Sequence, residues 1–376
     1  MSISISTAFD SGNIRVLSIT DTPEGVSADL EIVRDHQSDF YQWFHFRVAG
    51  VAGRAVELNI VNCAESAYPD GWAGYSARIS EDREDWLLAD TSYANGTLTI
   101  RLEEDSNAVW LAYFAPYSME RHHDLIAWAA CQPGVAHREL GLTLDGQTMD
   151  LLTIGNGPKQ VWLYARQHPG ETMAQWWMEG ALERLTDEED AVARLLRQKA
   201  TIHLVPNMNP DGSRRGHLRT NAVGVNLNRE WHEPTADKSP EVLLVRNAMD
   251  ETGVDFAMDV HGDEAIPAVF IAGFEGIPSI TERQLALYHR YRDTLAARTP
   301  DFQTRLGYPT AAPGKANLAM STNQVAERFG AVAMTLEMPF KDNDDLPDAD
   351  YGWSPARSIQ LGKDCLATLA EMIDSI

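Results

Sequence analysis

The hydrophobic pattern changes near residue 115, and this change constrains the fold more than any other feature of the sequence. Before it, short segments alternate apolar with polar residues, which is typical of strands with one buried face. Asn95-Gly96 supplies a hairpin turn before one of them. The regular spacing predicts an antiparallel β-sandwich domain over residues 1–115. The expected strands are 14–19, 27–32, 44–48, 56–60, 97–102 and 109–114.

The part after Pro116 has a different pattern, in which apolar strands alternate with helical stretches up to residue 376. This alternation predicts an α/β domain over 116–376, with a mixed, mostly parallel sheet flanked by helices. Polar or charged residues closely follow each apolar segment. Because open α/β sheets bind ligands beyond the carboxyl ends of their strands, we read these residues together. The expected strands are 161–165, 200–205, 254–258 and 331–336, after a first helix at 118–130.

Composition excludes several classes of function. The chain has 31 basic and 55 acidic residues, a net charge of −24 that disfavours binding to nucleic acid. No run of about 18 apolar residues and no basic-then-apolar leader occurs, so we expect neither membrane insertion nor secretion. Three scattered cysteines are too few for a disulfide framework, which favours a cytoplasmic location. The sequence leaves the oligomeric state open.

Two histidines and one glutamate form a candidate metal site. His168 and Glu171 follow the expected strand 161–165, and His261 follows the expected strand 254–258. Imidazole and carboxylate are suitable zinc ligands, although a lone His-x-x-Glu arises by chance about once in such a chain. Three protein ligands without an obvious fourth leave one position open, as in catalytic zinc sites.

The sequence also offers candidates for substrate binding, in a loop, and for proton transfer, at the end of a strand. Arg229 offers a planar fork that matches a carboxylate, and Asn228 beside it could complete recognition of a terminal carboxylate. Glu337 ends an otherwise apolar segment, and partial burial there would raise its pKa toward the range useful for a general base and acid.

Seven short motifs occur in order along nearly the whole chain. They are Phe40-Tyr-Gln-Trp-Phe-His-Phe46, Ile60-Val-Asn-Cys63, His168-Pro-Gly-Glu171, Asn209-Pro-Asp-Gly212, Gly224-Val-Asn-Leu-Asn-Arg-Glu-Trp231, His261-Gly262 and Thr335-Leu-Glu337. Together and in this order, they resemble the motifs of the cytosolic carboxypeptidases, a branch of the zinc carboxypeptidases related to carboxypeptidase A. The resemblance implies a zinc metallocarboxypeptidase, with one Zn²⁺ per chain, that hydrolyses the C-terminal bond of peptides or protein tails.

The resemblance also implies a role for each matched residue. His168, Glu171 and His261 become the zinc ligands, and Glu337 becomes the catalytic glutamate. Asn228 and Arg229 hold the terminal carboxylate of the substrate. Arg219 polarises the carbonyl group of the bond to be cleaved.

Three positions depart from the family pattern or do not align with it. Asn226 stands where relatives often have an aspartate that accepts a hydrogen bond from a zinc-bound histidine, so the negative charge is missing. Asp259, two residues before His261 on the same side of a strand, is a candidate to supply that charge. Tyr308 is our candidate for a tyrosine that closes over the substrate.

The substrate is the least constrained part of the prediction. Lys315 is the basic candidate in the segment 314–323, which should line the pocket for the terminal side chain. Eukaryotic relatives remove glutamates from protein tails, and Arg214, Arg215 and Lys315 would provide the basic path that an acidic protein needs for such tails. The alternatives are a zinc amidase or deacylase on the same scaffold, an inactive peptide-binding protein, and a structural zinc protein with a fourth ligand.

Overall fold

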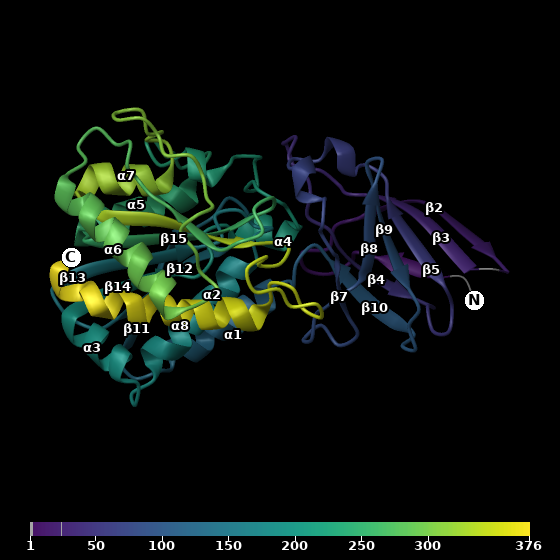
Figure 1. Cartoon of the computed structure of the whole chain (residues 1–376), viewed down its shortest axis with the longest axis horizontal. Coiled ribbons are helices and arrows are strands. Elements are labelled where there is room, and N and C mark those ends of the chain that lie inside the picture. The colour runs from purple at the N-terminus through teal and green to yellow at the C-terminus, as the bar shows by residue number, and fades with distance from the viewer. Residues whose placement is uncertain (1–2, 24) are drawn as a thin grey trace.

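In this computed structural model, which describes residues 3–23 and 25–376, the first part of the chain forms two five-stranded sheets (Figure 1). Alternate residues point into the space between the sheets, where Leu58 and Leu111 are fully buried. The predicted sandwich is confirmed, although β3 and β5 pair in parallel. One sheet has the order β1 (Ser4–Ser6), β4 (His45–Ala49), β10 (Ala108–Ala112), β6 (Arg78–Ser80), β7 (Leu87–Leu88), and the other β2 (Arg15–Thr22), β3 (Gly25–Glu31), β5 (Val56–Ile60), β9 (Thr97–Leu102), β8 (Asp90–Ala94).

The second part of the chain forms one seven-stranded sheet with helices on both faces (Figure 1). The predicted fold class is confirmed. The four central strands β14, β13, β15 and β17 are parallel, and the outer strands add antiparallel pairs. The order is β11 (Val135–Leu142), β12 (Thr148–Ile154), β14 (Ala200–Val205), β13 (Lys159–Ala165), β15 (Phe256–Asp263), β17 (Val332–Pro339), β16 (Phe270–Ala272).

Several helices begin at side chains that satisfy free backbone N–H groups. Ser118 accepts from the N–H of Arg121 at the start of α1, and Thr281 forms a reciprocal pair with Gln284 at the start of α6. The helices are α1 (Met119–Ala130), α2 (Met173–Thr186), α3 (Ala191–Lys199), α4 (Pro210–Arg215), α5 (Pro240–Thr252), α6 (Glu282–Arg298), α7 (Ser321–Phe329) and α8 (Pro355–Met372), with short 3₁₀ turns η1 (Cys63–Glu65), η2 (Pro69–Gly71), η3 (Leu227–Arg229) and η4 (Ile373–Ser375).

Buried contacts join the sandwich to the α/β part. The fully buried guanidinium of Arg78 donates to the carbonyl groups of Phe340, Lys341 and Trp353. The ring of Tyr113 stacks on Phe340 at 4.6 Å between centroids. We propose residues 115 and 116 as the border between two domains, because β10 ends before it and α1 begins after it.

Two central strands are longer than the sequence predicted. β15 extends to Asp263 and β17 to Pro339, so His261 and Glu337 lie within strands and not beyond them. The reason is pairing, since the parallel ladder continues through His261 opposite Glu337. Gly262 fits this crowded edge because a Cβ there would lie 2.4 Å from the sulfur of Met173. The two side chains are therefore held by hydrogen-bonded strands and not by loops.

A buried glutamate outside this edge makes the stability depend on pH. Burial and the nearby Asp211 raise the pKa of Glu241 from 4.5 to about 8. Unfolding therefore releases a proton between those values, and stability falls as the pH rises toward 8. At pH 9 we expect Glu241→Gln to raise the free energy of unfolding by about 1–2 kcal/mol. Denaturant unfolding at pH 5 and pH 9 measures this, and an equal effect at both pH values would contradict it.

Candidate active site

The turn after β13 carries two of the candidate ligands. Arg166 has a left-handed backbone, with φ of 61°, and its side chain is buried. Its guanidinium donates to the carbonyl oxygens of Pro169, at 2.9 Å, and Tyr117, at 2.7 Å, and to the side chain of Gln175, at 2.7 Å. These bonds fix the turn from both sides, so the strained backbone at Arg166 has a structural cause.

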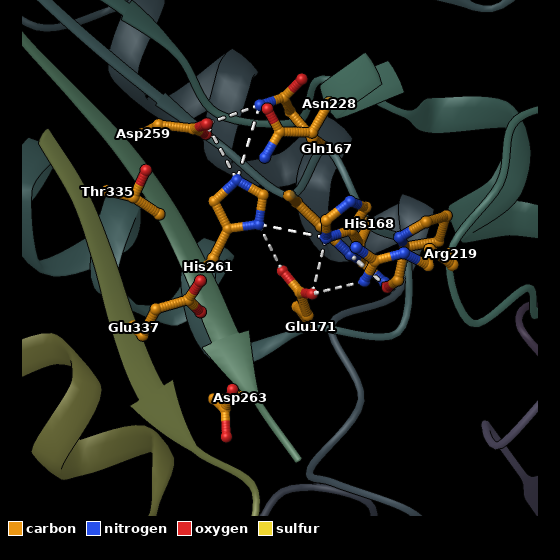
Figure 2. A network of polar contacts seen from close by, with 12 residues as sticks. Gln167, His168, Glu171, Arg219, Asn228, Asp259, His261, Asp263, Thr335 and Glu337 are labelled. Carbon is orange, nitrogen blue, oxygen red and sulfur yellow. Dashed lines mark hydrogen bonds and ion pairs between the residues drawn. The ribbon is translucent and has the colours of Figure 1, made fainter. Parts of the chain in front are cut away.

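His168, Glu171 and His261 meet at the carboxyl ends of β13 and β15, as Figure 2 shows. The Nδ1 atoms of the two histidines lie 3.1 Å apart. The carboxylate oxygens of Glu171 lie 2.7 Å from each of them. All three side chains are buried, and their ligand atoms lie within 4.8 Å of one another, an arrangement that could hold a metal ion.

The remaining nitrogen of each histidine faces an oxygen. Nε2 of His168 lies 3.1 Å from Oδ1 of Asn226, and Nε2 of His261 lies 2.9 Å from Oδ2 of Asp259. If each Nε2 donates to its partner, both Nδ1 atoms turn lone pairs toward the Glu171 carboxylate. Such lone pairs repel one another unless a cation lies between them. Two imidazoles and a carboxylate are also the donor types that zinc prefers, so the residues fit the ion.

Electrostatics keep two of these side chains in the forms that bind metal. Burial and the charge of Arg219 lower the pKa of His168 to about 3, so its imidazole is neutral. Burial would raise the pKa of Glu171, but His168 and His261 hold it below its usual value. Burial also opposes charge on His261, yet Asp259 and Glu171 raise its pKa well above the usual value. The cluster therefore attracts positive charge.

Glu337 lies opposite His261 in the sheet, and its carboxylate faces the same cluster (Figure 2). Only 5% of the residue is exposed. Oε1 lies 3.3 Å from the hydroxyl of Tyr308, whereas Oε2 is buried without a hydrogen-bond partner among the described residues. Burial raises the pKa of Glu337 well above its usual value, although His261 opposes this. A buried carboxylate oxygen without a partner is available to accept a proton.

The arginine and asparagine candidates come from the loop between α4 and α5. Asn228 is buried, and its Oδ1 accepts from the N–H of Ser321 at 2.9 Å, which leaves its amide NH₂ group for another partner. Arg229 is exposed and donates to the carbonyl of Asn228. Nη1 of Arg219 lies 4.0 Å from Oε1 of Glu171. The structure thus brings Arg219 beside the ligand cluster.

Tyr308 also lies beside the cluster. Its hydroxyl donates to Oδ2 of Asp263 at 2.6 Å, and its ring packs edge-on against Phe270. Asp263 ends β15 and accepts two backbone N–H groups, from Ala265 and Ile266, so it is itself fixed. The hydroxyl of Tyr308 is therefore directed toward Asp263 and Glu337, although the residue is 46% exposed.

A cavity of about 460 Å³ borders Tyr308 on the side of α7. Lys315, Arg292 and Arg305 line it with Glu275, and the Arg305 side chain pairs with Asp345. We expected Arg215 to line a basic path for acidic tails, but it does not line this cavity. Its guanidinium instead pairs with Asp145 at 2.7 Å. Its charge is used to fix the loop before β12, which the sequence did not indicate.

Sequence reasoning missed Gln167. Its side chain donates to Asp259 at 2.6 Å and accepts from the indole N–H of Trp231 at 2.7 Å. It thereby fixes the carboxylate that faces His261. Gln167 directly precedes His168, but only the folded arrangement reveals its partners.

Two known protein families match parts of this chain. Residues 5–114 match the cytosolic carboxypeptidase N-terminal domain family, and residues 125–266 match the zinc carboxypeptidase family. An uncharacterised protein of Zymomonas mobilis is 64% identical over all of this chain and 98% of its own length. Among the described residues, no helix is long and apolar enough to cross a membrane.

A solved structure and a curated relative specify the branch of the family. A metallo-carboxypeptidase from Pseudomonas aeruginosa, in complex with (2-guanidinoethylmercapto)succinic acid, is 45% identical with a TM-score of 0.96, and the match covers 99% of both chains. Cytosolic carboxypeptidase 1 of Danio rerio is 27% identical over 82% of this chain, which spans 30% of that relative's length. The chain belongs to the zinc carboxypeptidase family and is a metallocarboxypeptidase with the N-terminal domain of the cytosolic carboxypeptidases.

Proposed function

We propose that this enzyme removes the C-terminal residue of peptides or protein tails, with one zinc ion held by His168, Glu171 and His261. The convergence of two imidazole nitrogens and a carboxylate, 2.7 to 3.1 Å apart, carries the proposal. A zinc ion bound there would polarise the substrate carbonyl and bring the pKa of its water toward about 7. No fourth protein ligand belongs to the described cluster, which favours a catalytic over a structural zinc site.

Glu337 is proposed as the general base and acid. Its free Oε2 would take a proton from the attacking water and later deliver it to the leaving amine. Arg219 would donate to the carbonyl oxygen as negative charge develops on it. These two groups approach the ligand cluster from β17 and from the loop after α4, so a peptide bond could lie between them.

Asn228 and Arg229 are proposed to hold the terminal carboxylate. The oxygen of Asn228 is bonded to Ser321, and its NH₂ group has no hydrogen-bond partner among the described residues. Arg229 is exposed and positively charged. Tyr308 would cover the bound residue, since its hydroxyl lies near Glu337.

A preference for a terminal glutamate is the finer part of the proposal. Lys315 and Arg292 in the cavity beside Tyr308 would attract an acidic side chain. A preference for a basic residue is the second candidate, because Glu275 lines the same cavity and the compound bound to the Pseudomonas relative carries a guanidino group. The cytosolic carboxypeptidase relatives and the free cysteines Cys63, Cys131 and Cys365 support a cytoplasmic location.

The reaction is tested with one peptide in two forms, with a free and with an amidated C-terminus. We expect release from the free acid and at least a 100-fold lower kcat/KM for the amide, because the amide cannot make charge-assisted bonds to Arg229. Mass spectrometry of the released residue measures both rates. Equal rates would instead support the zinc amidase or deacylase alternative.

The preference is tested with matched peptides that differ only in the last residue. We expect kcat/KM for terminal glutamate to exceed that for lysine and phenylalanine by about 10-fold or more, through electrostatic attraction to the cavity. Lys315→Gln should lower only the glutamate rate. Faster release of lysine would contradict the glutamate preference but would still support the carboxypeptidase reaction.

A further inference from the structure

The guanidinium of Arg219 is held without hydrogen bonds to other described residues. Its side chain is 14% exposed, and no hydrogen bond from its guanidinium to another described residue occurs. Its nearest carboxylate oxygen, Oε1 of Glu171, lies 4.0 Å away. An arginine that must donate to a substrate needs its N–H groups free, so the protein has to fix it by other means.

Two aromatic rings of the sandwich supply part of that support. The central carbon of the Arg219 guanidinium lies 5.5 Å from the ring centre of Phe40 and 5.4 Å from that of Tyr68. Both rings are within the range of cation–π attraction, which holds a guanidinium in place without a hydrogen-bond acceptor. Phe40 and Tyr68 come from two separate loops of the sandwich, before β4 and before η2.

A carboxylate of the same domain fixes the backbone of Arg219. Asp35 is 2% exposed and accepts from the backbone N–H groups of Leu218, Arg219 and Thr220 at 2.7, 2.8 and 2.9 Å. It also accepts from the hydroxyl of Thr220 at 3.0 Å. One buried carboxylate thus orders the three residues centred on Arg219, across the border between the two domains.

A second contact holds the same two loops together. The backbone N–H of His36 donates to Nε2 of His217 at 3.1 Å. Gly224 passes so close to the carbonyl oxygen of Gln37 that a Cβ would lie only 2.3 Å from it. The loop 35–37 therefore contacts the segment 217–224 at both ends and around Arg219, and a shift of the Arg219 backbone would disturb these contacts.

We propose that Asp35, Phe40 and Tyr68 are positioning residues through which the amino-terminal domain sets the place of Arg219 beside the metal-ligand cluster. The inference rests on the proposed function, in which Arg219 donates to the carbonyl oxygen of the substrate. The sandwich is then a component of the active site, and its contribution is geometric.

The test is a double-mutant cycle between Asp35→Asn and Arg219→Ala, with kcat and KM measured on a peptide with a free C-terminus. The amide that replaces the carboxylate would keep an oxygen toward Arg219 and Thr220 but would turn its NH₂ group toward the N–H of Leu218. We expect Asp35→Asn to lower kcat by about 10- to 100-fold with KM changed less than about 2-fold, because a displaced donor loses mainly transition-state stabilisation. In the Arg219→Ala background, Asp35→Asn should have no further effect on kcat.

A matched control is Asp82→Asn. Asp82 also accepts two backbone N–H groups within the sandwich, from Glu84 and Asp85, but it fixes its own turn. We expect wild-type kcat for this variant. Thermal unfolding and zinc content are measured for every variant. If Asp35→Asn does not fold, Phe40→Leu and Tyr68→Leu replace it in the cycle. Each of these should lower kcat by about 3- to 30-fold.

Three outcomes would overturn the inference. An equal loss from Asp35→Asn in both backgrounds would show that Asp35 does not act through Arg219. Full activity of Asp35→Asn beside an inactive Arg219→Ala would remove the positioning role and leave the proposed function intact. Wild-type kcat for Arg219→Ala would remove the role of Arg219 itself, and the positioning role with it.

Discussion

Glu337→Gln is expected to lower kcat for release of a C-terminal residue by about 10³- to 10⁴-fold, with little change in KM. Glutamine has nearly the same shape but cannot accept and return a proton. The effect should be large because Oε2 of Glu337 is a buried oxygen without a partner in the described structure, so no neighbouring side chain is bonded there to take over its role. Steady-state kinetics on a zinc-loaded preparation measures the loss.

The control for this variant is Glu241→Gln, a change of the same type at another buried glutamate whose pKa is also raised. Its kcat at pH 7 should match that of the wild type, although its stability differs. Zinc content should be the same in all three proteins, since neither residue is a proposed ligand. Activity of Glu337→Gln within 10-fold of the wild type would assign the proton transfer to another group.

The central sheet was predictable because buried strands leave a clear trace in the sequence. The segment expected at 200–205 coincides with β14 of this sheet, and in the sandwich the segment expected at 97–102 coincides with β9. The ends of β15 and β17 were not predictable, since they depend on pairing between residues about 76 positions apart, such as His261 and Glu337. The parallel pairing of β3 with β5 was not predictable either. The alternation of apolar and polar residues indicates which face of a strand is buried, but not which strand lies next to it.

The side chains at strand ends were predictable from position, but their supporting contacts were not. Asp259 could be paired with His261 from the sequence, because residues two apart on a strand share one face. The contacts of Asp35 with Arg219 cross 184 residues and two domains, and nothing near Asp35 in the sequence indicates them. Arg166 likewise has an ordinary sequence context, and only its positive φ shows that the turn is strained.

Removal of the metal is expected to abolish activity and to lower stability. Treatment with a chelator should reduce the rate to below about 1%, since the attacking water and the carbonyl would both lose their activation, and added zinc should restore it. Zinc at 100 times its Kd should stabilise the folded protein by about 2.7 kcal/mol, which thermal unfolding with and without zinc measures.

His261→Gln should remove both effects, because the Glu171 carboxylate would then face only one imidazole. Loss of a supporting partner alone commonly weakens metal binding 10- to 100-fold, so loss of a ligand should weaken zinc binding by more than about 100-fold. His137→Gln is the matched control, since His137 also pairs with a carboxylate, Asp150, at 2.8 Å, but lies outside the cluster of candidate ligands. Zinc titration followed by metal analysis separates the two variants. Retention of one zinc per chain by His261→Gln, or its loss from His137→Gln, would place the ion elsewhere, because the candidate ligand cluster includes His261 and not His137.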